Sequence, residues 1–238
     1  MLFRSALRQV PRPGALTHYW AQTPHLRTRY TFEYLSGAGA LQLIHFGIGA
    51  VLGLAAIGAL RAAQSLLGPF NQLLTGLSVG LMPELVRLRR ERHDRLVRVT
   101  ALISSGAVLV VVVGTLVLAG IPDSWGRALL GDTWSGAQQL LVPAGAAIAA
   151  NMAIVGPLLG LRALARPRSS LQARMVGSLL AVVGAGVALV LGGSVLVVAW
   201  VIAASVWVGA VGWWVVFLRE PVGPLISAEN VSDAPQAT

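Results

Sequence analysis

A line of amide and hydroxyl side chains interrupts a stretch that is otherwise apolar enough for lipid. Gln64, Asn71, Thr75 and Ser78 fall within one stripe of a helix that advances about 100° per residue. Amides and hydroxyls donate and accept hydrogen bonds, so the stripe predicts a wall that faces water, a substrate or polar neighbours. The alternative is that these groups bond to adjacent helices and only hold the bundle together.

A second polar face comes earlier in the chain, where Gln42 and His45 share a helical side with small residues. His45 would lie near mid-membrane, where ionisable groups are functional candidates. The alternative for His45 is a neutral ring that is hydrogen-bonded to a neighbouring helix. Two consecutive helices with polar faces can line one cavity, whereas the isolated Asn151 is interpreted as an interhelical hydrogen-bonding group.

Enzymatic chemistry finds little support in the residue types. The chain shows no pair of intramembrane acids and no HExxH, GxSxG or phosphate-binding P-loop motif. The absence of cysteine excludes disulfides, thiolate metal sites and a cysteine nucleophile. We therefore expect no catalytic residue, no metal and no cofactor.

The composition indicates an all-α, polytopic membrane protein. Of the 238 residues, 55% are hydrophobic and only 11% are charged, and the mean hydropathy is +0.73. Such values exceed what a soluble domain needs. The net charge of +9 could indicate nucleic acid, but the arginines lie between long apolar runs, which argues against that partner.

Apolar stretches of about 20 residues predict membrane-spanning helices. The sequence contains six such stretches, at residues 34–60, 64–86, 99–121, 138–161, 175–193 and 195–218. Tight turns are expected at "GALRAAQ" between the first two and at "GGS" between the last two. Residues 1–33 are expected to form a polar, basic cytosolic lead-in, and residues 219–238 a polar, disordered tail.

The arginines predict the orientation of the bundle. With six spans, every arginine except Arg61 and Arg127 falls on the side of the amino terminus. The positive-inside rule therefore predicts cytoplasmic amino and carboxyl termini. We expect Trp125 and Trp134 to flank the outer end of the fourth span, and Trp213 and Trp214 to be interfacial anchors.

Four prolines within the predicted spans are possible hinges: Pro69, Pro83, Pro143 and Pro157. Bending helps a transporter to alternate between two states, although proline is also common in membrane helices without that purpose. The pair Gly156 and Gly160 is compatible with close helix packing.

Four stretches of the sequence carry a family resemblance: "RYTFEYL", "LGLAAIGALRAAQSLLGPFNQLLTGLSVGLMPELVR", "LLGDTWSGAQQLL" and "GLRALARPRSS". Through them, the chain from Arg29 to Arg219 resembles the second half of bacterial O-antigen and polysaccharide flippases, within the multidrug, oligosaccharidyl-lipid and polysaccharide exporter superfamily. These motifs are soft and hydrophobic and include no catalytic signature. The resemblance implies a six-helix bundle similar to one lobe of a MATE-like flippase in the bacterial cytoplasmic membrane.

The resemblance also implies a function. Two such lobes rock against each other and carry an undecaprenyl-diphosphate-linked oligosaccharide outward through a central cavity. The implied substrate pathway comprises Gln42, His45, Arg61, Gln64, Asn71, Thr75 and Ser78. Arg61 would meet the diphosphate, because guanidinium suits bidentate phosphate contacts, or would be a snorkelling interfacial arginine.

This sequence contains one such lobe, so the resemblance implies either a fragment or truncated gene, or a chain that pairs with a second six-helix lobe, another copy or a separately encoded chain. Two alternatives remain open. One is a multidrug-type exporter lobe, and the other is a non-transporting scaffold of a cell-envelope polysaccharide synthesis complex.

Overall fold

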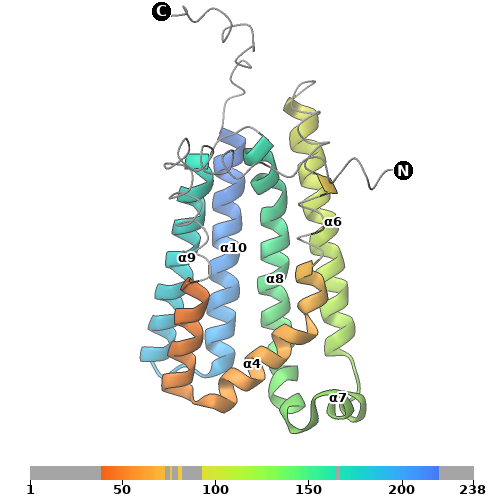
Figure 1. Ribbon diagram of the computed structural model, residues 1–238, viewed down its shortest axis with the longest axis vertical. Helices are drawn as coiled ribbons and strands as arrows, with labels where there is room; N and C mark the ends of the chain where they lie inside the picture. Colours follow the sequence, from red (N-terminus) through yellow and green to blue (C-terminus); the bar gives the residue numbers. More distant parts are fainter. Residues whose placement is uncertain (1–38, 73–75, 77–79, 82–92, 164–166, 220–238) are drawn as a thin grey trace, which may run out of the picture.

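The computed structural model describes residues 39–72, 76, 80–81, 93–163 and 167–219 (Figure 1). The predicted lead-in, the tail from residue 220 onward, and Thr75, Ser78 and Pro83 lie outside these residues. The described elements, in chain order, are a helix at Gly39–Leu52, α4 (Leu54–Leu66), a helical turn at 68–72, α6 (His93–Ala119), α7 (Asp123–Leu130), the 3-10 helix η2 (Gly131–Thr133), α8 (Trp134–Ala163), α9 (Pro167–Val190) and α10 (Val195–Arg219).

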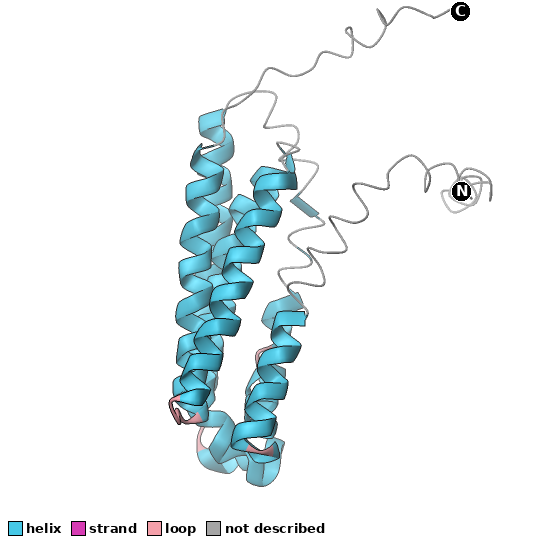
Figure 2. Ribbon diagram, turned by 90° about the vertical axis from the view of Figure 1, so that its left-hand side faces the viewer, coloured by secondary structure: helices cyan, strands magenta, loops and turns pink. Residues whose placement is uncertain are grey.

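Within the described part of the chain, four helices, α6, α8, α9 and α10, are long and apolar enough to cross a membrane. They contain 27, 30, 24 and 25 residues, which exceeds the roughly 20 that a bilayer requires. They run along the long axis of the molecule (Figures 1 and 2). The all-helical prediction is therefore confirmed for the described part of the chain, and four of its helices fit the length and composition of membrane spans.

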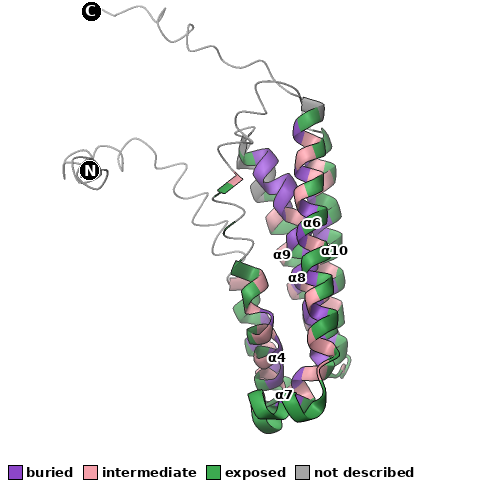
Figure 3. Ribbon diagram, turned by 90° about the vertical axis from the view of Figure 1, so that its right-hand side faces the viewer, coloured by how far each residue is buried: buried purple, intermediate pink, exposed green. Residues whose placement is uncertain are grey.

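The centre of this arrangement is α8. Of its apolar stretch, 72% is buried, against 17%, 22% and 28% of the apolar stretches of α6, α9 and α10. Helices α4, α6, α9 and α10 all contact it. The outer helices expose large apolar side chains instead, such as Leu102, Leu109 and Leu116 along α6. Figure 3 shows exposed positions along the length of α6 and α10. Such a surface suits hydrocarbon, because its side chains are apolar and the polar groups of the helix backbone are already hydrogen-bonded to one another.

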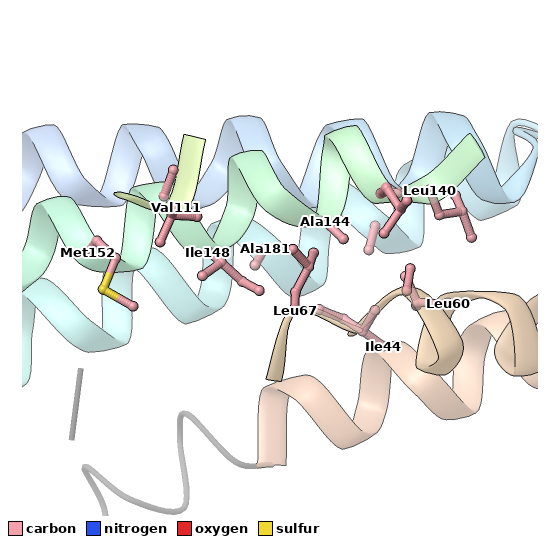
Figure 4. Packing of buried hydrophobic residues seen from close by; sticks show 14 of the residues in the cluster. Ile44, Leu60, Leu67, Val111, Leu140, Ala144, Ile148, Met152 and Ala181 are labelled. Carbon is pink, nitrogen blue, oxygen red and sulfur yellow. The ribbon is translucent and has the colours of Figure 1, made fainter. Parts of the chain in front are cut away.

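The turn predicted at "GALRAAQ" is wrong, because α4 continues as a helix through those residues. The chain bends earlier, at Gly53, whose φ of 86° lies in the left-handed region that glycine adopts without a Cβ penalty. The face of α4 that carries Leu60 and Ala63 is buried in the core, together with Leu67 (Figure 4). This burial keeps the segment helical, and α4 crosses one end of the bundle (Figure 1).

The predicted turn at "GGS" lies where α9 and α10 meet. The turn comprises residues 191–194, and Gly192 has a φ of 74°. It places α9 and α10 side by side as an antiparallel pair (Figure 1). Gly177 and Gly209 face each other across the pair, where an added Cβ on Gly209 would lie 3.5 Å from the Gly177 Cα atom. These small residues let the two helices approach closely.

Trp125 on α7 and Trp134 at the start of α8 flank that helix end as the sequence predicts, whereas Trp213 and Trp214 differ from the expectation. Trp125 on α7 is exposed, but Trp134 is buried, and its Nε1 donates a hydrogen bond of 3.0 Å to Asp123 Oδ1. Its ring lies against Gly126. Trp213 is buried and Trp214 is half-buried, so the prediction that both are interfacial anchors is wrong. All three rings serve helix packing, which sequence position alone does not reveal.

Replacing Trp134 by phenylalanine is expected to lower the free energy of unfolding by about 1–2 kcal/mol. The change removes the hydrogen bond to Asp123 and leaves part of a closely packed site unfilled. Trp125→Phe is the matched control, since Trp125 is exposed on α7, and we expect it to change stability by less than about 0.5 kcal/mol. Unfolding in detergent micelles measures both. Equal losses would show that Trp134 does not fix α7 to α8.

Candidate functional site

One cavity of about 420 Å³ lies between the first described helix and the bundle. Its walls come from the helix Gly39–Leu52, the turn at 68–72, and helices α8, α9 and α10. Most of the lining is apolar, including Ile44, Ile154 and Trp213. Its volume falls within the roughly 300–1,000 Å³ of ordinary ligand pockets.

Four polar residues from three elements converge on this cavity: Asn71, Asn151, Arg174 and Ser178. Asn151 donates from Nδ2 to the Ala147 carbonyl of its own helix at 3.1 Å, which leaves its Oδ1 available as an acceptor. Asn71 makes no hydrogen bond to another described residue and is exposed to the open part of the site. The cavity thus combines an apolar wall with two amides, one hydroxyl and one guanidinium.

Arg174 is the one formally charged residue among the described residues that line the cavity. Its Nε is buried without a hydrogen-bond partner in the described structure, and no described acid pairs with it. A buried polar atom without a partner costs about 1–3 kcal/mol. An anionic ligand would supply the missing acceptors, because the guanidinium fork matches phosphate and carboxylate oxygens.

Of the described members of the predicted pathway, one, Asn71, lines the cavity. Gln42 and Arg61 are exposed on other faces, and Gln64 is half-buried on α4. His45 is buried beside the cavity wall but does not line it. The chain bends at Gly53, and Gln42, His45 and Gln64 on either side of this bend do not line the cavity. Thr75 and Ser78 lie outside the described residues.

Arg174 and Asn151 were not recognised as site residues from the sequence. In the sequence, Arg174 is one of the arginines outside the spans that predict the orientation, because the predicted span begins at residue 175. In the structure, α9 begins at Pro167. The periodicity that indicated the other faces is present here too. Arg174, Gly177, Ser178 and Ala181 all line the cavity, with the spacing of one helical face. Extending the span by two turns would have revealed this polar, small-residue face.

His45 is a buried residue whose two ring nitrogens have no hydrogen-bond partner in the described structure. Replacing such a group by an apolar side chain of similar size removes two unsatisfied polar atoms. We therefore expect His45→Leu to leave the free energy of unfolding unchanged or to raise it by about 1 kcal/mol. Gln42→Leu, at an exposed position of the same helix, is the control. A clear loss of stability in the His45 variant alone would reveal a partner for the ring.

Two of the possible hinge residues, Pro143 and Pro157, lie inside α8, which continues through both. Because Pro157 has no N–H, the Ala153 carbonyl loses its usual partner in the helix. That oxygen instead accepts hydrogen bonds from Ser104 Oγ of α6 at 3.2 Å and from Trp214 Nε1 of α10 at 2.9 Å. We call these four residues the carbonyl node. It ties α8 to two neighbours, which argues against free bending at Pro157.

Ser104 also accepts a hydrogen bond of 2.8 Å from the backbone N–H of Gly156. The approach is so close that a Cβ at Gly156 would overlap the Thr100 carbonyl oxygen. One turn later, Gly160 lies under the ring of Phe217. Gly156 therefore allows α6 to approach α8 closely, and Gly160 does the same for α10.

Comparison of the chain with protein-family models, with curated proteins and with solved structures gave no match. The flippase resemblance accordingly rests on the quoted sequence motifs.

Proposed function

We propose that the chain is one lobe of a membrane transporter that moves an anionic amphiphile, of the lipid-linked oligosaccharide class, across the bacterial cytoplasmic membrane. The observation that carries the proposal is the cavity with the unpaired Arg174 in a mostly apolar lining. The guanidinium suits a phosphate-type head group, and the apolar wall suits the start of a hydrocarbon chain. The sequence resemblance supplies the specific class, an undecaprenyl-diphosphate-linked glycan.

The size of the cavity supports a partner lobe. A volume of about 420 Å³ accommodates a head group of the size of a diphosphate with a short part of its lipid, but not a whole glycolipid. A second lobe, either another copy of this chain or a separate six-helix protein, would supply the rest of the enclosure. Native mass spectrometry in mild detergent tests this directly. A mass near twice 24.8 kDa, or a complex with a second membrane protein, is the expected result.

The charge of the lining favours this function over a multidrug-type exporter for cations. A cationic drug would meet Arg174 and no acidic side chain among the described lining residues. Like charges in a cavity of low dielectric repel strongly. A scaffold without transport activity would need no such cavity, so loss of ligand binding on substitution of a lining residue separates the two classes.

Asn71 and Gln72 provide a matched pair of variants for that test. Both are exposed, and only Asn71 lines the cavity. We expect Asn71→Ala to weaken binding of a short-chain fluorescent polyprenyl diphosphate by about fivefold, the effect of one hydrogen bond. Gln72→Ala should bind as the original chain does. Fluorescence anisotropy with the purified full chain measures both affinities, and equal affinities in the two variants would contradict the proposed site.

A further inference from the structure

The carbonyl node and the cavity occupy opposite sides of the same two turns of α8. Asn151, Ile154, Val155 and Leu158 line the cavity, and their spacing places them on one helical face. Ala153 and Pro157 fall on the other face, where Ser104 and Trp214 reach the carbonyl oxygen. Any rotation or shift of these two turns therefore moves the node and the cavity wall together.

The node also lies next to the part of the cavity wall that α10 supplies. Trp213, which lines the cavity, directly precedes Trp214, whose Nε1 bonds to the Ala153 oxygen. The Trp214 ring packs edge-on against Phe217, with ring centroids 6.0 Å apart. Phe217 in turn packs against Gly160 of α8. These contacts between α8 and α10 therefore lie within two helical turns of the residues that line the cavity.

Proline frees the acceptor of this contact. In an uninterrupted helix the N–H of residue 157 would donate to the Ala153 carbonyl and occupy part of its acceptor capacity. Pro157 withdraws that N–H, and membrane helices satisfy such a freed carbonyl from neighbouring side chains. Because residue 157 is proline, the Ala153 carbonyl oxygen is an acceptor that side chains of α6 and α10 share.

We propose that Ser104 and Trp214 are positioning residues of the cavity, which hold its α8 wall and Trp213 in the arrangement that a ligand meets, through the carbonyl that Pro157 leaves free. The role of the cavity as a ligand site rests on the proposed function. The geometric link between the node and the wall does not depend on the ligand.

The absence of cysteine from the sequence allows a direct measurement of the wall. In the full chain, Ile154→Cys places one thiol on the cavity wall, and its rate of reaction with a water-soluble methanethiosulfonate reports its exposure. Adding Trp214→Phe keeps an aromatic ring but removes the donor, and we expect the rate to change by about fivefold. Adding Trp207→Phe, on the outer side of the same helix, should leave the rate within about twofold.

Restoring the missing N–H at residue 157 tests whether the freed carbonyl, and not the bulk of the Trp214 ring, explains the change in rate. Pro157→Ala lets residue 157 bond to the Ala153 carbonyl, so the node is no longer needed to satisfy that oxygen. Together with Trp214→Phe, it should bring the reaction rate at position 154 back toward that of the reporter alone. A general packing role of the Trp214 ring predicts no such rescue. Equal rates in the Trp214 and Trp207 variants, or a failure of Pro157→Ala to restore the rate, would overturn the proposal.

Ser104→Ala repeats the test if the Trp214 variant does not fold, since Ser104 donates to the same oxygen from α6. The same rate change and the same rescue by Pro157→Ala are expected. A thiol at the exposed Leu129 of α7 serves as the reference for reagent access. Binding of the polyprenyl diphosphate probe is measured in parallel. If the rates follow expectation but the probe does not bind, the proposed function fails and the positioning role stands. If the rates stay unchanged and the probe binds normally, the positioning role fails and the proposed function stands.

Discussion

Arg174→Met is expected to weaken binding of an anionic amphiphile by about 10- to 150-fold, the loss that corresponds to about 1.5–3 kcal/mol for hydrogen bonds to a charged group. Methionine keeps an unbranched apolar stem, so the change removes the guanidinium while the packing of that stem is largely retained. The low dielectric of a mostly apolar cavity places the effect toward the upper end of this range. Fluorescence anisotropy of a short-chain polyprenyl diphosphate in detergent micelles measures the affinity.

Arg162→Met is the matched control for this prediction. It removes the same charge from the exposed last turn of α8, outside the cavity. We expect it to alter affinity by less than about threefold, because an exposed charge is screened by water and salt. Arg174→Lys should lie between the two, since it keeps the charge but lacks the planar fork. Equal affinities in the Arg174 and Arg162 methionine variants would exclude Arg174 as the ligand contact.

Gly156→Ala is expected to lower the free energy of unfolding by about 2–4 kcal/mol. The added Cβ would overlap the Thr100 carbonyl oxygen and the Ser104 hydroxyl, and a backbone carbonyl cannot move aside as a flexible side chain can. Overpacking of this kind costs about 1–3 kcal/mol, and displacement of Ser104 also breaks its bonds to Gly156 N–H and the Ala153 carbonyl. Unfolding by a denaturing detergent measures the change.

Gly106→Ala provides the comparison for Gly156→Ala. Gly106 lies on α6 with no atom within 4 Å of an added Cβ, so the substitution meets no steric barrier. Alanine has the higher helix propensity, and we expect the stability to stay equal or to rise by up to about 1 kcal/mol. A similar effect of both substitutions would show that α6 and α8 are not in close contact at Gly156.

Long apolar spans could be predicted because their signal is strong and one-dimensional. The predicted ranges 99–121 and 195–218 lie over α6 and α10, whose bounds are His93–Ala119 and Val195–Arg219. The first turn was placed wrongly, at "GALRAAQ", which lies within α4. The Leu60 face of α4 is buried, and Gly53, with its positive φ, forms the bend instead.

The roles of the tryptophans and prolines could not be predicted in the same way. Interfacial placement of Trp213 and Trp214 was inferred from their position near a helix end, yet one ring lines the cavity and the other bonds to Ala153. Pro157 was interpreted as a possible hinge. Its consequence depends on whether neighbouring helices offer donors for the carbonyl that it frees, and those donors lie on α6 and α10, far away in the sequence.

The sequence by itself determined the helical class and the apolar character of the long helices. Hydrocarbon demands about 20 apolar residues per span and a backbone that satisfies its own hydrogen bonds, and both requirements are local. Only the tertiary structure decided which polar groups meet. Asn71, Asn151 and Arg174 come together because the bend at Gly53 and the small residues of α8 to α10 set the rotation of each helix against its neighbours. Helix rotation depends on contacts between segments that are distant in the chain, which no single stretch of sequence contains.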